Sequence, residues 1–235
     1  MMEIGGLEKS TLIDYPGRIA ATVFLIGCNF RCPFCYSSEL VLPEKIKLQP
    51  RMSEKVFFNF LKERQGLIDG VVICGGEPTL QKDLPGFIKK IKNLGYLVKL
   101  DTNGFNPEML GKLIKNGLLD YIAMDVKAPL EEEKYNKAAG VKVDLEKIKR
   151  SIGLIKGSGV DYEFRTTVIP TIHVREDIVQ IAEDIGPAKK YYLQNFRPEK
   201  TISPGLERIK PYPKEFLLEI KKEISRLFEV CEVRG

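Results

Sequence analysis

Short runs of apolar and β-branched residues alternate along the chain with stretches in which apolar residues recur at helical spacing. Six runs are nearly continuous in such residues, which is typical of strands buried on both faces of a parallel sheet. The predicted strands are Ala20–Ile26, Gly70–Cys74, Leu97–Leu100, Leu119–Asp125, Tyr162–Ile169 and Lys190–Phe196.

Helices are predicted between these strands and after the last one. In one segment, Leu84, Phe87, Ile88 and Ile91 recur at positions i, i+3, i+4 and i+7, so they share one helix face. The predicted helices are Ser53–Gln65, Leu84–Asn93, Pro107–Asn116, Leu145–Gly157, Val174–Asp184 and Lys214–Phe228. Right-handed strand–helix–strand crossovers then allow an α/β fold that is either a doubly wound sheet or a barrel-like curl.

The 235 residues show no shift in composition that would separate domains. We therefore expect a single domain over residues 1–235, with its core at about 18–198 and a C-terminal helix at about 214–228. Two segments are predicted to be irregular. Leu40–Pro50 is rich in proline and lysine, and Arg197–Pro213 contains four prolines.

Composition excludes several classes of protein. Hydrophobic residues at 43% and charged residues at 29% are globular values and exclude a disordered chain. A net charge of +5 falls short of a nucleic-acid-binding surface, so no nucleic acid partner is expected. The longest uncharged apolar run, Ile19–Cys28, is too short to cross a bilayer, and the N-terminus lacks the apolar core of a secretory signal. No membrane partner is expected.

The five cysteines are an odd number, and three of them fall within eight positions, which does not resemble a disulfide framework. This usage predicts a reducing, cytoplasmic location. The chain has one histidine and no tryptophan, which argues against acid–base or metal sites built on histidine.

The three clustered cysteines are Cys28, Cys32 and Cys35, in the sequence CNFRCPFC directly after the first predicted strand. Soft thiolates in such a loop select iron–sulfur clusters, zinc or copper(I). A closed zinc site or a fully ligated cluster needs four protein ligands. The remaining candidates for a fourth ligand are Cys74, Cys231 and His173. None of them has a second ligand at the spacing usual for zinc. The pattern favours a 4Fe-4S cluster with one iron left open, and a zinc site or structural thiols are the alternatives.

Polar residues also follow the other predicted strands. They are the segments GGEPT (75–79), DTNG (101–104), DVK (125–127) and QNFRP (194–198), together with Arg165. Each has a plain structural interpretation by itself, as a tight turn or an ion pair. Ligands of parallel α/β folds bind at the carboxyl ends of the strands, so their joint occurrence predicts a polar ligand at one rim.

The combination of CxxxCxxC with a later GGEP resembles the radical S-adenosylmethionine (SAM) enzymes. Within them, the chain is similar to the glycyl-radical-enzyme activating enzymes, and most of residues 10–170 carry the likeness. The supporting segments are IDYPGRIAATVFLIGCNFRCPFCYSSEL, GGEPTLQ, LDTNGF, MDVKAP and RTTVIP. Among these enzymes it looks most like the anaerobic ribonucleoside-triphosphate reductase activating proteins.

This resemblance implies a curled partial (β/α)6 barrel, in which outer helices cover a parallel sheet. It also implies one 4Fe-4S cluster, held through three irons by Cys28, Cys32 and Cys35. The amine and carboxylate of SAM would bind the fourth iron.

Further residues are implied in SAM binding by the same resemblance. Phe34 would pack on the adenine, and Gly75, Gly76 and Glu77 would line the methionyl amino group. The other SAM-contacting positions are Asp101, Asn103, Asp125, Lys127 and Arg165. A monovalent cation site, found in one branch, would use Asp101, Thr102, Asp125 and Val126.

The chain also departs from its relatives. Residues 36–71 contain no cysteine, which argues against a second, ferredoxin-like cluster. Tyr36 stands where histidine is frequent. Arg197 stands near the position of a SAM-contacting histidine in the pyruvate formate-lyase branch, which argues against a close role of that kind.

The implied activity is reductive cleavage of SAM, followed by abstraction of a glycine α-hydrogen from a partner enzyme. The expected partner is anaerobic ribonucleotide reductase, and the expected electron donor is reduced flavodoxin or ferredoxin. We expect the partner's loop to enter a groove between Leu40–Pro50 and Arg197–Pro213. The alternatives are activation of another glycyl radical enzyme, a radical SAM enzyme acting on a small molecule, a ferredoxin-like carrier with a fourth thiolate, and a zinc-binding scaffold.

Overall fold

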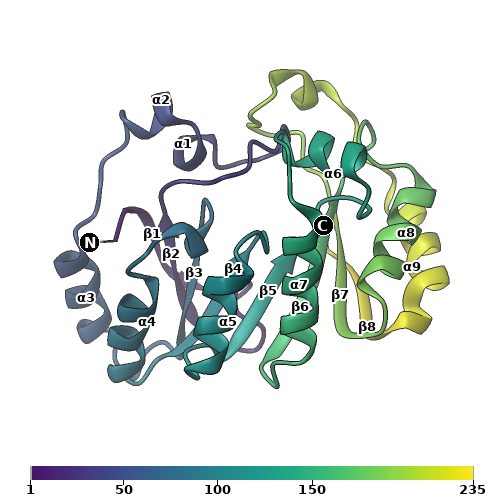
Figure 1. The fold of residues 1–235 in the computed structure, drawn as a ribbon. Helices are drawn as coiled ribbons and strands as arrows, with labels where there is room; N and C mark the ends of the chain where they lie inside the picture. The colour runs from purple at the N-terminus through teal and green to yellow at the C-terminus, as the bar shows by residue number, and fades with distance from the viewer. Residues whose placement is uncertain (1, 235) are drawn as a thin grey trace.

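The computed structural model of the chain describes residues 2–234, in which eight strands form one sheet in sequence order (Figure 1). The first pair of strands is antiparallel and all other neighbours are parallel. The strands are β1 Ile4–Thr11, β2 Ala20–Leu25, β3 Gly70–Gly75, β4 Leu97–Thr102, β5 Tyr121–Asp125, β6 Asp161–Val168, β7 Ala188–Asn195 and β8 Phe228–Arg234. Within the described residues β1 and β8 do not pair, so the sheet stays open.

Helices connect the parallel strands and cover one face of the sheet, as α3, α4, α5 and α7 do in Figure 1. The α-helices are α1 Ser38–Val41, α2 Pro43–Ile46, α3 Glu54–Glu63, α4 Leu84–Asn93, α5 Pro107–Lys115, α6 Glu132–Ala139, α7 Leu145–Lys156, α8 Arg175–Ile185 and α9 Lys214–Ile224. Three short 3-10 helices are η1 Pro78–Leu80, η2 Pro204–Arg208 and η3 Ser225–Leu227. None of the helices within residues 2–234 is long and apolar enough to cross a membrane.

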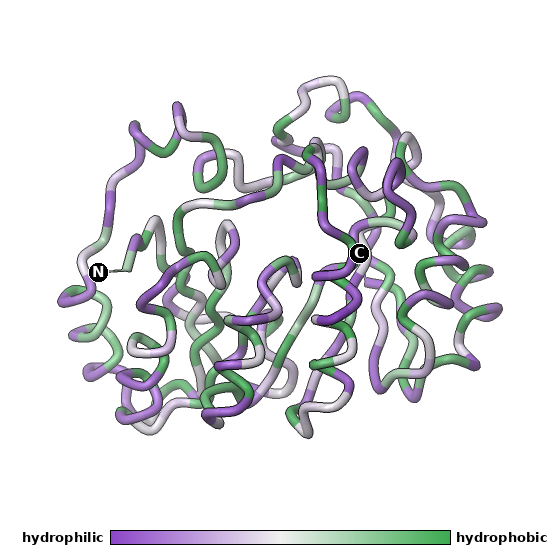
Figure 2. The backbone as a smooth tube through the Cα atoms, in the orientation of Figure 1, coloured by the Kyte–Doolittle hydropathy of each residue, from purple (hydrophilic) through white to green (hydrophobic). Residues whose placement is uncertain are grey.

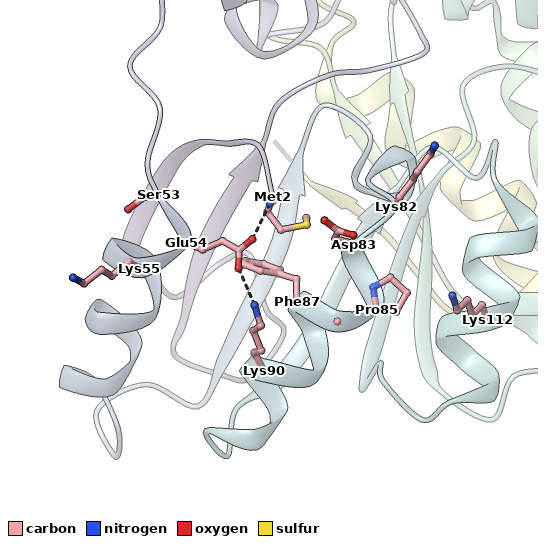
Figure 3. A pocket seen from close by; sticks show the side chains of 11 residues that line it. Met2, Ser53, Glu54, Lys55, Lys82, Asp83, Pro85, Phe87, Lys90 and Lys112 are labelled. Carbon is pink, nitrogen blue, oxygen red and sulfur yellow. Dashed lines mark hydrogen bonds and ion pairs between the residues drawn. The ribbon is translucent and has the colours of Figure 1, made fainter.

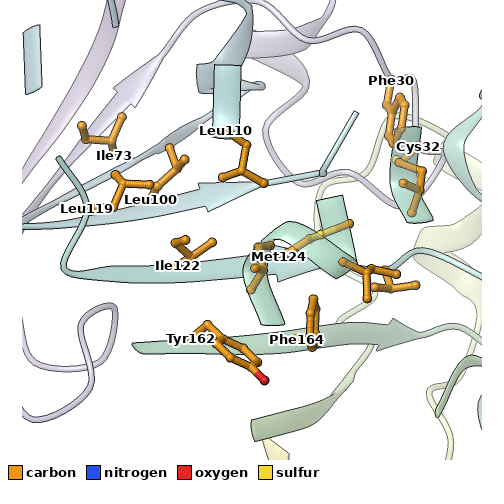
Figure 4. Close-up of a cluster of buried hydrophobic side chains, with 14 of the residues drawn as sticks. Phe30, Cys32, Ile73, Leu100, Leu110, Leu119, Ile122, Met124, Tyr162 and Phe164 are labelled. Atoms are coloured by element: carbon orange, nitrogen blue, oxygen red, sulfur yellow. The ribbon is translucent and has the colours of Figure 1, made fainter. Parts of the chain in front are cut away.

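The main core lies between the sheet and these helices. Many apolar side chains of the strands are fully buried there, among them Ile73, Leu100 and Ile122 in Figure 4. Figure 2 shows apolar positions along the central strands, whereas the helices and the outer strands mix polar and apolar positions. This burial is the main term that stabilises the fold.

All six predicted strands are present as β2–β7, and the predicted fold class is confirmed. The predicted helix at Lys214–Phe228 is wrong at its end, because α9 stops at Ile224 and the chain returns as β8. The sequence FEVCEVR is rich in valine and phenylalanine, which favour strands, and this preference overrides the helical spacing before it. The prediction also missed β1 and α6. α6 is mostly polar and buries only Tyr135, Ala138 and Ala139.

The two segments predicted to be irregular contain short helices. Residues 40–50 include part of α1 and all of α2, and residues 197–213 include η2. Both lie above the carboxyl ends of the strands, at the top of Figure 1.

The inner face of the sheet is more polar than the sequence analysis expected. In β6, Tyr162 and Phe164 belong to the core under the helices, whereas Glu163, Arg165 and Thr167 alternate with them. Successive side chains of a strand point to opposite faces, so these three lie on the face away from the helices. The expectation of strands apolar on both faces is therefore wrong for this part of the sheet.

Candidate active site

The carboxyl ends of the strands surround a cavity of about 720 Å³. Almost all of the predicted site residues line it. They are Cys28, Cys32, Phe34, Cys35, Gly75, Gly76, Asp101, Asn103, Asp125, Lys127 and Arg165. Residues that are far apart in the sequence thus meet at one place, as the order of the parallel strands requires.

The cysteine loop is held by hydrogen bonds to its backbone, from the Arg31 side chain, from within the loop and to α6. The Arg31 guanidinium donates to the carbonyl oxygens of Cys28 (2.6 Å) and Phe30 (2.7 Å), and the Arg31 N–H donates to Ala139 O (2.8 Å). A further turn is closed by the Cys35 N–H, which donates to Cys32 O at 3.0 Å. These hydrogen bonds hold the backbone of the loop that carries the three thiols.

Burial raises the pKa of the Cys28 thiol to about 11 and that of Cys32 to about 12, and it also raises the pKa of Cys35. The positive charge of Lys127 acts against this rise in all three thiols. Without a metal the three thiols are thus protonated at neutral pH, and a metal group must displace their protons when it binds.

Within residues 2–234, no three His, Cys, Asp or Glu side chains are placed to hold one metal ion. A zinc site needs such a group. In a 4Fe-4S cluster each cysteine binds its own iron, so the three thiols need not meet at a single ion. The arrangement of the thiols fits a cluster better than it fits zinc.

The turn after β3 brings the second motif against the cysteine loop. Gly75 has φ +118°, in the region that favours glycine, and a Cβ on Gly76 would lie 2.0 Å from the oxygen of Gly27. The N–H groups of Gly76 and Glu77 donate to Leu25 O and Gly27 O, both at 2.8 Å. Both glycines are required by this close approach of two backbones.

Glu77 does not line the cavity, unlike the other predicted SAM-contacting residues, and its contact with the methionyl amino group stays a prediction. Its buried carboxylate accepts hydrogen bonds from the hydroxyl of Thr102 (2.8 Å), the N–H of Asn103 (2.6 Å), and the N–H and hydroxyl of Thr79. Burial raises its pKa, although these bonds favour the charged form. Asn103 in turn donates to Asn29 Oδ1 at 2.9 Å. Glu77 therefore positions other residues of the site.

The four charged residues predicted at the strand ends, together with Lys99, form one network. Arg165 donates to Asp125 Oδ1 (2.8 Å) and Asp101 Oδ2 (3.0 Å). Lys127 pairs with Asp125 Oδ2 at 3.0 Å, and Lys99 pairs with Asp101 Oδ1. Burial alone would raise the pKa of Asp101, but Arg165 and Lys99 outweigh it and hold that pKa below its usual value.

The residues predicted for a monovalent cation are engaged with other protein groups in this structure. Each carboxylate oxygen of Asp101 and Asp125 already faces a cationic nitrogen. The hydroxyl of Thr102 donates to Glu77, and the carbonyl oxygen of Val126 accepts from Thr166. The cation site stays a prediction.

The three candidates for a fourth ligand lie in different surroundings. Cys74 lines the cavity, and burial raises its pKa to about 12. Cys231 and His173 do not line it. Both ring nitrogens of His173 are occupied by backbone groups, those of Ile169 and Lys127. A histidine ligand at this site is therefore excluded by the geometry.

A segment after β7, residues 196–203, crosses the cysteine loop, and we call it the strap. The N–H groups of Ile202 and Ser203 donate to Cys35 O (3.2 Å) and Pro33 O (2.9 Å). The Tyr36 ring stacks on Phe196 at 6.4 Å between centroids, and its hydroxyl accepts from the N–H of Arg197 at 2.8 Å. The strap therefore covers the loop that carries the cysteines.

The sequence analysis missed several residues of the cavity wall. They are Asp14, Thr167, Glu199, Lys200 and Arg234. The polar residues at every second position of β6 and β7 were a usable signal, because they indicate a strand with one polar face. Arg234 lies on the unpredicted strand β8, where it binds Glu163 through two hydrogen bonds of 3.0 Å.

A second cavity, of about 660 Å³, lies between the first turns of α3 and α4 (Figure 3). Glu54 there accepts hydrogen bonds from the N–H of Met2 (2.8 Å) and from Lys90 (3.0 Å). No cysteine and no predicted site residue lines this cavity. Of the two cavities, only the first is lined by residues of the sequence motifs.

Comparison with known proteins agrees with this geometry. Residues 22–185 match the family model described as the Radical SAM superfamily. A protein of Methanocaldococcus jannaschii, provisionally named a glycyl-radical enzyme activating enzyme, is 37% identical over 232 residues, which cover 96% of this chain and 92% of the relative. A second protein of that organism with the same provisional name is 29% identical, over 69% of this chain and 61% of the relative. A provisionally named GTP 3′,8-cyclase of Metallosphaera sedula is 27% identical, over 88% of this chain and 63% of the relative.

Solved structures share the fold at low sequence identity. QueE from Escherichia coli matches with a TM-score of 0.59 and 16% identity, over 100% of this chain and 94% of that one. Streptococcus suis SuiB bound to S-adenosylmethionine matches with a TM-score of 0.63 and 17% identity, over 89% of this chain and 48% of that one. The chain belongs to the radical SAM superfamily, whose enzymes use a 4Fe-4S cluster and S-adenosylmethionine.

Proposed function

We propose that this radical SAM enzyme installs a glycyl radical on a partner enzyme. The observation that carries the proposal is the 37% identity, over nearly the full length of both chains, to the provisionally named activating enzyme. The likeness extends beyond the cysteine motif to the whole barrel and the strap, where partner contacts would lie.

Cys28, Cys32 and Cys35 are the proposed ligands of three irons. They converge on one cavity, and no fourth protein ligand comes with them at a zinc-like spacing. Phe34, Gly75 and Gly76, with Asp101, Asn103, Asp125, Lys127 and Arg165, would form the wall for SAM. When bound, the cluster and SAM together supply a 5′-deoxyadenosyl radical by one-electron cleavage of the sulfonium.

The chain's own residues bind and orient these groups. Lys127 and Arg165 present positive charge to a carboxylate, and Asp101 and Asp125 present negative charge to an ammonium, which matches the two ends of an amino acid. Because Arg165 holds both carboxylates in one network, the site is organised before a ligand arrives. Such pre-organisation turns the reaction of two bound groups into an intramolecular event.

Anaerobic ribonucleoside-triphosphate reductase is the proposed target, and reduced flavodoxin or ferredoxin is the proposed electron donor. The target loop would enter between residues 40–50 and the segment 197–213, above the cavity. A second candidate function is cyclisation of a nucleotide, because several provisionally named GTP 3′,8-cyclases also match. This chain spans 63% or less of the first two of these, so it lacks much of their length.

The function is tested with anaerobically reconstituted protein, dithionite and SAM. We expect 5′-deoxyadenosine to form and, with purified anaerobic ribonucleotide reductase of the same organism added, a glycyl radical to appear by electron paramagnetic resonance. Cleavage of SAM without that radical, combined with turnover of added GTP, would favour the cyclase instead.

The cysteine assignment is tested separately by iron content. Cys32→Ala should abolish cluster binding, because a buried ligand is lost and no other thiol belongs to this loop. Cys231→Ala is the matched control, since Cys231 is equally buried but packs in the core away from the cavity. Full iron content in Cys32→Ala would refute the assignment.

A further inference from the structure

We propose that His173 and Tyr135 are positioning residues. They clamp the backbone of Lys127 so that its ammonium stabilises the negative charge added when the metal group on Cys28, Cys32 and Cys35 is reduced. The inference rests on the cysteine assignment of the proposed function. It does not depend on which partner the enzyme activates.

The clamp consists of contacts to both backbone polar groups of Lys127. Its N–H points to the Tyr135 hydroxyl at 3.4 Å, and its carbonyl oxygen faces Nε2 of His173 at 2.8 Å. Tyr135 and His173 are both fully buried. They come from α6 and from the turn after β6, so two separate elements fix the residue that follows β5.

The hydrogen bonds fix the state of the histidine ring. Nδ1 of His173 faces the N–H of Ile169 at 3.1 Å and can only accept, whereas Nε2 faces a carbonyl oxygen and must donate. The ring is therefore neutral, with its proton on Nε2. The Tyr212 hydroxyl donates to the carbonyl oxygen of His173 at 2.9 Å, which also fixes the backbone of the turn.

The clamp directs the Lys127 side chain toward the cysteine loop. Its ammonium pairs with Asp125 at 3.0 Å and lies 5.9 Å from the centre of the Phe34 ring, and Phe34 stands between Cys32 and Cys35. Only 15% of the lysine side chain is exposed.

A fixed cation at this place favours reduction. One added electron makes the metal group more negative, and a cation that water screens poorly stabilises that charge more strongly than a solvated one. The stabilisation requires a fixed ammonium, because a lysine free to turn toward solvent would be screened. A buried clamp on the lysine backbone meets this requirement.

The test is redox titration of the reconstituted protein without SAM, followed by electron paramagnetic resonance. Lys127→Met should shift the one-electron reduction equilibrium toward the oxidised form by about tenfold, which corresponds to a midpoint lower by about 59 mV. His173→Phe and Tyr135→Phe should each shift it in the same direction by less, and Lys127→Arg should restore most of the wild-type value.

Lys99→Met is the matched control. Lys99 is also a buried lysine paired with an aspartate two residues away in a strand, but it does not line the cavity. It should alter stability and leave the potential close to that of the wild type. An unchanged potential in Lys127→Met, or an equal shift in Lys99→Met, would overturn the inference.

A second measurement does not depend on variants that fold. The chain has one histidine, so nitrogen NMR of the metal-free, tag-free protein reports on His173 alone. We expect a neutral ring with the proton on Nε2. A ring protonated on Nδ1 at neutral pH would contradict the clamp. Loss of cluster binding in the wild type would instead refute the proposed function.

Discussion

Charged residues that follow the strands serve different purposes in this site according to the direction of their side chains. Glu77 comes from the motif that also supplies Gly75 and Gly76, yet its carboxylate turns away from the cavity and holds the Asn103 loop. Lys127 follows a strand end in the same way, but its ammonium lies in the cavity wall. The direction of the side chain, which packing determines, separates a positioning residue from a binding one.

Glu77→Gln should destabilise the fold by about 1–3 kcal/mol. The amide nitrogen of glutamine replaces one carboxylate oxygen, so a buried donor loses its acceptor. It should also weaken SAM binding, since Asn103 loses its anchor. Urea unfolding and the SAM dissociation constant measure the two effects. Glu54→Gln is a matched control at the surface and should cost no more than about 1 kcal/mol. Equal losses in both variants would contradict the role of Glu77.

His173 should make stability depend on pH. Burial holds its pKa below the usual 6.5, so the folded state binds fewer protons than the unfolded state below that pH. Its contribution is fully present above pH 6.5 and is lost as pH falls toward the lowered pKa, by at most about 1.4 kcal/mol per pH unit. The charges that face it are those of Asp177 and Lys137.

The measurement is urea unfolding of the metal-free protein between neutral and mildly acidic pH, compared with His173→Gln. The variant should lose the part of the slope that the wild type shows below pH 6.5. Identical slopes in the two proteins would show that His173 does not titrate in this way.

At the scale of elements, the segments without regular structure carry the site. The cysteine loop follows β2, the strap follows β7, and each is fixed by hydrogen bonds to the other. The barrel strands set the positions at which these segments begin. The loops then supply the thiols and the cover, so a change in a loop should affect the site more than it affects the fold.

Tyr36→Ala should expose the cysteine loop, because it removes both the stack on Phe196 and the acceptor for the Arg197 N–H. We expect the bound cluster to bleach several-fold faster in air, with a loss of stability of about 1 kcal/mol. Tyr36→Phe keeps the stack and should bleach at a rate closer to that of the wild type. The decay of visible absorbance in air measures this rate, and equal rates in all three proteins would contradict a protective strap.

For the whole molecule, the core and the charged part of the site are distinct. The main hydrophobic core runs under the helices along the sheet and extends to the cysteine loop at the rim, whereas the charged network lies on the inner face. The fold therefore does not depend on the metal group for its apolar burial. This arrangement differs from small metal-dependent domains, which unfold without their metal.

Removal of iron by a chelator should leave a cooperatively folding protein. We expect the far-ultraviolet circular dichroism to stay near that of the loaded protein and the melting temperature to fall by roughly 2–8 °C, as expected for the loss of a bound ligand. Anaerobic melts with and without chelator measure the change. A chelated protein with no cooperative transition would show that the cluster, and not the core, holds the fold.

The sequence by itself determined the fold class, the six central strands and which three cysteines lie together. Local period and motif spacing carry this information, because buried strands read as apolar runs and the thiols are neighbours in the chain. It did not reveal β8, since a helical pattern runs directly into a strand-like one at Phe228. It also could not show that α6 supplies a clamp, because only Tyr135, Ala138 and Ala139 are buried in a polar helix.

Only the tertiary structure decided which polar residues face the cavity and which of them bind one another. Arg165 reaches two carboxylates from different strands, and His173 reaches the backbone of Lys127 across 46 positions of sequence. Such contacts depend on the register of the sheet and on the direction of each side chain, which local sequence does not encode. The sequence therefore specifies which chemical groups are available, and the packing of the sheet determines which contacts each of them makes.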